Sequence, residues 1–140
     1  MAKEQVKVKW LDKMAFSAEV NGHEIVLDAA EKVGGEDRGP RPKPLMLAAL
    51  AGCTGMDVIS ILKKMHIEPD YFNVYVEGDL TEEHPKHFSK MHVIYEFKGK
   101  NLPLEKLKRA VSLSEERYCG VSATYREAME MTSEIKVIES

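Results

Sequence analysis

Cysteine is scarce in this sequence: only Cys53 and Cys119 occur among 140 residues. They lie far apart in the chain, whereas metal sites usually draw on closely spaced cysteine pairs, and a lasting structural disulfide is disfavoured in a reducing compartment. Two interpretations remain open. The cysteines are either small buried hydrophobic residues, as free cysteine often is, or a redox pair. Composition and spacing alone favour the inert thiols.

The sequence also shows no excess of one charge, no recognisable secretory signal and no internal repeats. The net charge of -3 with mixed signs gives no electrostatic case for nucleic acid or a membrane surface as a partner. The first ten residues, MAKEQVKVKW, contain no apolar core or cleavage site, so no secretory signal is expected. We predict a cytoplasmic protein with a single domain over residues 1–140.

The segment Arg38–Met65, RGPRPKPLMLAALAGCTGMDVISILKKM, is the one around which the fold is expected to form. Its prolines keep the approach extended, so a helix should begin near Pro44 and end at the basic pair Lys63-Lys64. Leu45–Ala51 has no polar side chain, which predicts burial on all sides. Because 140 residues can hardly cover such a helix, we predict an obligate dimer in which two copies pack together.

This apolar run approaches the length of a membrane span. It also contains Thr54, Asp57, Ser60 and two glycines, which favour a buried helix of a soluble protein. Asp57 lies one turn after Cys53, on the same face of the predicted helix.

Strand and helix patterns fill the rest of the chain. The Asn21-Gly22 pair predicts a tight hairpin turn, and a helix is expected over Pro103–Tyr118. Strand patterns cover six segments: Val6–Trp10, Ala15–Val20, Glu24–Leu27, Tyr71–Leu80, Met91–Phe97 and Thr132–Glu139. Strand runs separated by two helices predict an α+β fold with antiparallel sheets around a long buried central helix.

A cysteine on a helix, with a second just after another helix, suits two-step thiol chemistry. The first thiolate attacks an oxidant and becomes a sulfenic acid, and the second thiol condenses with it to a disulfide. Such a site needs a nearby cation, and four basic residues are candidates: Lys13, Arg38, Arg41 and Arg126. Asp57 alone would oppose a thiolate by like-charge repulsion, so its expected use is to orient a cation.

Two motifs together resemble one known family. The segment PRPKPLMLAALAGCTGMDVISILKKM, with its cysteine in a glycine-flanked apolar helix, resembles the central helix of the OsmC/Ohr proteins, the osmotically inducible and organic hydroperoxide resistance proteins. EERYCGVSAT resembles the second cysteine motif of that family, and TEEHPKHF resembles a loop of a less characterised OsmC-like branch. The predicted order of elements matches along nearly the whole chain.

The resemblance implies an intertwined homodimer with two active sites at the subunit interface, each with one cysteine pair. It implies a stress-response peroxidase that acts on organic hydroperoxides, with Cys53 as the peroxidatic residue and Cys119 as the resolving one. The reductant would be a dithiol such as a lipoylated protein. Neither a metal nor an organic cofactor is expected.

The sequence departs from the family pattern beside the helix. The best-known peroxidases have a glutamate about where Lys43 and Pro44 stand here, and the partner arginine of the first hairpin is missing, with Lys13 the nearest basic residue. We predict Arg41 or Arg38 as the cation that stabilises the Cys53 thiolate, with Asp57 as a supporting carboxylate.

The alternative function is a non-catalytic dimeric module that holds a small hydrophobic molecule in an apolar interface cleft. The distance between the two sulfurs distinguishes the two functions. Sulfurs near disulfide range favour redox chemistry, whereas distant sulfurs enclosed by apolar side chains favour the module that binds a hydrophobic molecule.

Overall fold

A computed structural model describes residues 2–139 of the chain. These residues form two compact units, and the boundary falls between Met46 and Leu47. The single domain over residues 1–140 stays a prediction.

The N-terminal unit is a three-stranded antiparallel meander, followed by a loop. Its strands β1 (Lys7–Asp12), β2 (Ala15–Val20) and β3 (His23–Leu27) pair in sequence order. Asn21 and Gly22 have φ values of 50° and 78°, as a tight two-residue hairpin requires. The predicted hairpin turn is therefore confirmed. A short 3₁₀ helix, η1 (Glu31–Val33), lies in the loop that leads to the long helix.

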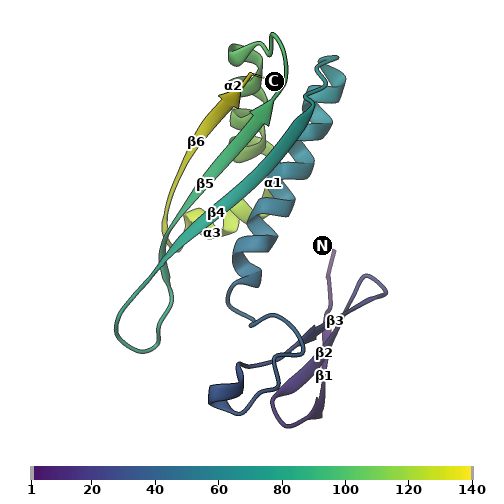
Figure 1. Cartoon of the computed structure of the whole chain (residues 1–140), viewed down its shortest axis with the longest axis vertical. Coiled ribbons are helices and arrows are strands. Elements are labelled where there is room, and N and C mark those ends of the chain that lie inside the picture. The colour runs from purple at the N-terminus through teal and green to yellow at the C-terminus, as the bar shows by residue number, and fades with distance from the viewer. Residues whose placement is uncertain (1, 140) are drawn as a thin grey trace. The chain divides into compact units, whose positions relative to one another are not determined.

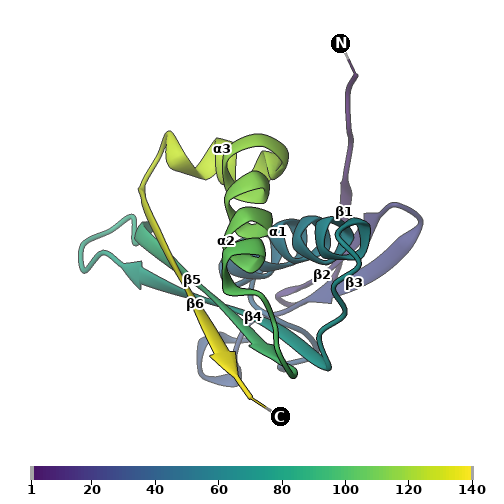
Figure 2. The same ribbon diagram turned by 90° about the horizontal axis from the view of Figure 1, so that it is seen from above.

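The C-terminal unit packs helices against one face of a second three-stranded sheet. Figures 1 and 2 show α1 and α2 side by side on that face, and the strand order is β4-β5-β6. Its elements are α1 (Leu45–Lys64, which begins two residues before the boundary), β4 (Tyr71–Leu80), β5 (Phe88–Lys98), α2 (Leu104–Leu113), the π-helical turn η2 (Ser114–Tyr118), α3 (Gly120–Arg126) and β6 (Glu130–Ile138). Helix α1 begins directly after Pro44 and ends at Lys64, as predicted.

One strand pairing differs from the expected all-antiparallel arrangement. Strands β4 and β5 pair antiparallel, as expected, but β6 pairs parallel with β5, in a register from Lys90↔Glu130 to Lys98↔Ile138. The reason is the connection: α2, η2 and α3 carry the chain back to the end of the sheet where β5 began, so the next strand runs in the same direction. The expectation of antiparallel sheets is wrong for this pair.

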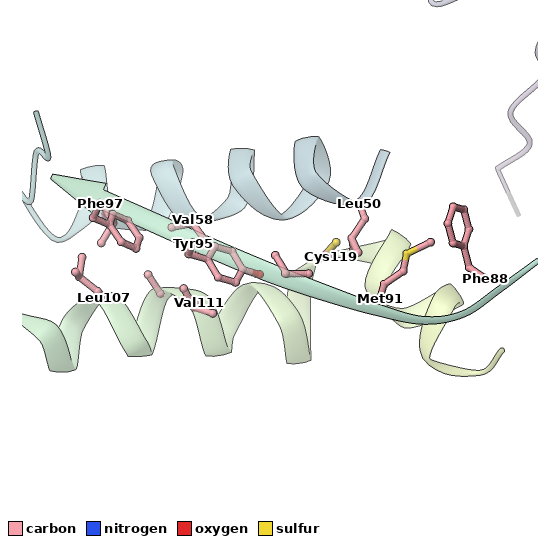
Figure 3. Packing of buried hydrophobic residues seen from close by; sticks show 12 residues of the cluster. Leu50, Val58, Phe88, Met91, Tyr95, Phe97, Leu107, Val111 and Cys119 are labelled. Atoms are coloured by element: carbon pink, nitrogen blue, oxygen red, sulfur yellow. The ribbon is translucent and has the colours of Figure 1, made fainter. Parts of the chain in front are cut away.

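The core of the C-terminal unit lies between α1, α2 and the inner face of the sheet (Figure 3). Strand β5 contributes alternate residues from Met91 to Phe97, all buried, within the segment predicted as a strand. Helix α2 contributes Leu107, Ala110 and Val111. The fully buried Tyr95 lies between the two helices, which brings its hydroxyl group into the middle of the core.

Helix α1 buries a single stripe. Leu50, Thr54, Val58 and Leu62, spaced one turn apart, are its buried residues, whereas Met56 is 73% exposed. Because the sheet and α2 cover only one side, the expectation of burial on all sides is wrong for the single chain. Helix α1 is also the one helix among residues 2–139 that is long and apolar enough to cross a membrane, a test that core helices of soluble proteins pass as well. The obligate dimer stays a prediction.

Candidate active site

Three of the five predicted site residues converge in the C-terminal unit. The Sγ atoms of Cys53 and Cys119 and a carboxylate oxygen of Asp57 all lie within 4.8 Å of one another. Both cysteines are free thiols. A disulfide bond is about 2.05 Å long, so a modest movement of one side chain would let the sulfurs bond. This proximity favours redox chemistry over the inert thiols that composition alone favoured.

A π-helical turn sets the position of Cys119. At the end of α2 the helix widens over η2, and the Cys119 N–H donates to the Ser114 carbonyl oxygen at 2.7 Å. Cys119 itself is extended, with φ -78° and ψ 102°, and caps the N-terminus of α3. Its Sγ accepts a hydrogen bond from the Ser122 N–H at 3.3 Å. Single π turns of this kind occur frequently at functional sites.

The two thiols differ in their surroundings. Cys119 is 3% exposed, whereas Cys53 is half-buried. Burial raises the pKa of the Cys119 thiol; hydrogen bonds from Ser122 act in the opposite direction, and the neighbouring Cys53 raises the pKa further. Cys119 is therefore held as a neutral thiol, whereas Cys53 is the less buried of the two cysteines.

Sequence reasoning missed four residues next to this site. The carboxylate of Asp57 accepts a hydrogen bond from Ser114 Oγ at 3.0 Å, and Ser114 Oγ lies 2.7 Å from Thr54 Oγ1. Thr54 Oγ1 lies 2.8 Å from the Tyr95 hydroxyl, which donates to Glu115 Oε2 at 2.8 Å. A sequence signal existed: Thr54 and Ser114 are polar residues within otherwise apolar stripes, and buried hydroxyl groups need partners.

The carboxylate at the end of this line borders a cavity of about 360 Å³. Its other lining residues are Val93, Glu116, Ser122, Arg126, Met131, Thr132 and Ser133. Arg126 donates to the backbone carbonyl of Glu115 at 2.5 Å, so this candidate cation is engaged at the cavity rather than with a sulfur.

The two predicted partner arginines lie in the N-terminal unit and are paired with carboxylates there. Arg38 forms ion pairs with Asp12, Asp28 and Glu36 at 2.5, 3.3 and 3.4 Å. Arg41 pairs with Asp37 at 2.6 Å. Their role beside the Cys53 thiolate stays a prediction.

Asp28 organises the loop that carries Arg38. Burial acts to raise the pKa of Asp28, but hydrogen bonds from the Ala29, Arg38 and Glu36 N–H groups and from the Arg38 side chain outweigh it and lower the pKa to about 2. The buried carboxylate therefore stays ionised and fixes both the loop and the guanidinium group.

Cys53, Asp57 and Cys119 are also the group within residues 2–139 whose ligand atoms lie close enough together to hold a metal ion. Two sulfurs and one carboxylate oxygen would suit zinc chemically. The same three groups are what a two-thiol redox site needs, and a site without metal or organic cofactor stays our prediction.

Comparison with known proteins places this arrangement in a family. The family model for OsmC-like proteins matches residues 34–134. Protein YhfA of Escherichia coli strain K12 is 31% identical over 135 residues, which cover 96% of this chain and 98% of that protein.

Solved structures agree over nearly the whole chain. A hypothetical protein from Aquifex aeolicus VF5 superposes with a TM-score of 0.86 at 28% identity, covering 100% of this chain and 99% of that one. The organic hydroperoxide resistance protein OhrB of Bacillus subtilis has the same fold, with a TM-score of 0.66 at 21% identity, covering 95% of this chain and 98% of that one. The resemblance drawn from the two cysteine motifs is confirmed: the chain belongs to the OsmC-like protein family.

Proposed function

We propose that the protein is a thiol-dependent peroxidase that reduces organic hydroperoxides, with Cys53 as the nucleophile and Cys119 as the resolving thiol. The observation that carries the proposal is the pair of free sulfurs within 4.8 Å, one half-buried and one buried. The substrate class is supported by the OhrB protein of Bacillus subtilis, a structure of the same fold that is named for organic hydroperoxide resistance.

The reaction would proceed in two steps. The Cys53 thiolate attacks the terminal oxygen of the hydroperoxide, the O–O bond breaks, and the alkoxide takes up a proton to leave as an alcohol. Cys119 then loses its proton and attacks the sulfur of the Cys53 sulfenic acid; the S–O bond breaks and the oxygen leaves as water. A dithiol reductant, for example a lipoylated protein, returns two electrons and two protons to the disulfide.

The different burial of the two thiols fits these roles. Cys53 must meet a substrate from outside, whereas Cys119 reacts only with a neighbouring sulfur and can remain buried. Arg41 or Arg38 would stabilise the Cys53 thiolate, with Asp57 in support. The short distance between the sulfurs weighs against the alternative, a non-catalytic module that holds a small hydrophobic molecule.

The proposal includes a homodimer in the cytoplasm, with no nucleic-acid or membrane partner. The exposed apolar face of α1, which includes Met56, supports a protein interface there, because soluble monomers rarely leave such a face open. Gly52 on the same helix has open space where a side chain would be, which would permit close approach of a second helix.

Turnover with a dithiol tests this function. Reduced wild-type protein should consume cumene hydroperoxide as dihydrolipoamide is oxidised, and Cys53→Ser should abolish that consumption. Cys119→Ser should support a single turnover only. Consumption by Cys53→Ser at the wild-type rate would show that Cys53 is not the nucleophile.

A further inference from the structure

A continuous line of five polar side chains connects the sulfur pair with the cavity beside Glu115. In order they are Asp57, Ser114, Thr54, Tyr95 and Glu115, and each lies between 2.7 and 3.0 Å from the next. The three hydroxyl residues in the middle are fully buried, at 0% exposure. Water cannot reach them, so each hydroxyl group depends on its neighbours in the line.

The line is one proton short when both of its ends are ionised. It has four contacts but only three hydroxyl protons. If Ser114 donates to Asp57 and Tyr95 donates to Glu115, the Thr54 proton can serve one of its two contacts only. One buried pair of oxygens would then face each other without a proton between them, which is costly away from water.

One additional proton completes every contact. Placed on Glu115, it makes all hydroxyl groups donate in the direction of Asp57; placed on Asp57, it makes all of them donate in the direction of Glu115. Moving the proton from one end to the other reverses three hydroxyl groups and requires no movement of heavy atoms. Burial raises the pKa of Tyr95, so its hydroxyl group stays protonated and passes protons without becoming an anion.

We propose that these five residues form a proton relay that holds one shared proton and moves it between the sulfur pair and the cavity. Its catalytic consequence rests on the peroxidase function proposed above. With the shared proton at Asp57, that carboxyl group is neutral beside the Cys53 thiolate, which removes the like-charge repulsion between them. The same proton is then available to the alkoxide that leaves when the O–O bond breaks.

The relay also assists the second step of the reaction, in which Cys119 attacks the Cys53 sulfenic acid. Cys119 is a buried thiol that must give up its proton before it attacks the Cys53 sulfenic acid, and the carboxylate of Asp57 lies within 4.8 Å of its sulfur. Asp57 accepts that proton and returns it to the departing oxygen, which leaves as water. No net proton is gained or lost in this step.

The groups around the two ends of the relay come from several elements, and Glu116 lines the same cavity as Glu115. Asp57 faces Cys53 on its own helix, Cys119 at the start of α3 and Ser114 of η2. At the other end, Glu115 accepts hydrogen bonds from Tyr95 of β5 and, at 3.3 Å, from the exposed Ser133 of β6, while Arg126 of α3 binds its backbone carbonyl. Because Glu115 lines the cavity, its carboxyl group can exchange protons with solvent there.

Infrared spectroscopy tests the shared proton independently of catalysis. Reduced wild-type protein should show the C=O stretch of a protonated, hydrogen-bonded carboxyl group, which shifts in D₂O. Tyr95→Phe and Thr54→Val should abolish this band. Each removes one hydroxyl proton together with two contacts, so that two hydroxyl protons remain for two contacts and no additional proton is needed. Thr54→Ser retains the hydroxyl group and should retain the band.

A matched control is available on the outer face of the sheet. Tyr75→Phe makes the same chemical change at an exposed hydroxyl group that donates to Glu96, outside the relay, and should leave the band unchanged. Absence of the band from wild-type protein, or its persistence in Tyr95→Phe, would overturn the relay.

Single-turnover kinetics test whether the relay takes part in catalysis. After cumene hydroperoxide is added, the Cys53–Cys119 disulfide should form roughly tenfold or more slowly in Tyr95→Phe than in wild type, with an altered pH profile and solvent isotope effect. Thr54→Ser should behave as wild type. If wild type forms no disulfide, the peroxidase function is wrong, and the infrared result alone decides whether the relay exists. If Tyr95→Phe reacts at the wild-type rate with the wild-type isotope effect, the relay has no part in catalysis.

Discussion

The hydroxyl group of Thr54 stabilises the core of the C-terminal unit, and it also forms the middle of the proposed proton relay. It lies 2.7 Å from Ser114 Oγ and 2.8 Å from the Tyr95 hydroxyl, and all three residues are fully buried. Thr54→Val keeps the size and branching of the side chain and removes both hydrogen bonds. At about 1 kcal/mol for each buried bond, the free energy of unfolding should fall by about 2 kcal/mol.

Thr54→Ser is the matched comparison, because it keeps both hydrogen bonds and removes a methyl group. Loss of one methyl group should lower the free energy of unfolding by about 1 kcal/mol. We therefore expect the order wild type, Thr54→Ser, Thr54→Val, from the most to the least stable. A smaller amino acid should thus be tolerated better than one of equal size.

Urea unfolding at one fixed protein concentration measures these differences. Far-ultraviolet circular dichroism follows the helices, which lie almost wholly in the C-terminal unit, and the fluorescence of Trp10, the single tryptophan, follows the N-terminal meander. A Thr54→Val protein as stable as wild type, or more stable than Thr54→Ser, would show that the hydroxyl contacts contribute nothing to stability.

Four other predictions concern the thiols, the loop and the proposed interface. Cys119→Ser should fold as wild type but, with excess hydroperoxide, gain the oxygens of a sulfinic or sulfonic acid at Cys53, measured by mass spectrometry. Because the pKa of Asp28 is lowered from 3.8 to about 2, its stabilising effect is complete above pH 3.8 and lost as pH falls to about 2; Asp28→Asn should remove that part of the acid unfolding profile followed by tryptophan fluorescence. Gly39→Ala would place a Cβ atom 1.9 Å from a carbonyl oxygen of β3 and should destabilise the N-terminal meander by roughly 1–3 kcal/mol in urea unfolding. Met56→Glu should weaken the dimer, measured by sedimentation, while unchanged mass in solution would contradict α1 as the interface.

Local chemistry made much of the fold predictable. Pro44 and the basic pair Lys63-Lys64 marked the ends of α1 to within a residue, because proline favours the first turn and cations favour the last. The alternation along β5 identified its buried face, since side chains of a strand point to opposite sides in turn.

Features that depend on distant parts of the chain were not predictable in this way. The pattern of β6 marks a strand but does not say which neighbour it joins or in which direction, and the crossover through α2 and α3 decided both. The apolar run of α1 could not show that only one stripe is covered within the chain. A pattern reports what a side chain prefers, whereas burial depends on what packs against it.

The candidate site was predictable in part. The motifs around Cys53 and Cys119 identified both thiols, and helical spacing placed Asp57 with Cys53. The line of hydroxyl groups was missed because Thr54, Ser114 and Tyr95 come from three different elements. The π-helical turn that brings Ser114 and Cys119 together has no simple sequence signal, because it changes the helical spacing on which the prediction relied.

The most direct test of the proposed function is the intact mass of the reduced protein before and after a small excess of cumene hydroperoxide, with hydrogen peroxide in parallel and digestion to locate any bond. We expect rapid loss of two hydrogen atoms per chain through a Cys53–Cys119 disulfide, faster with the organic peroxide. An unchanged mass would show that the two neighbouring thiols are not activated toward peroxides and would contradict the proposed function.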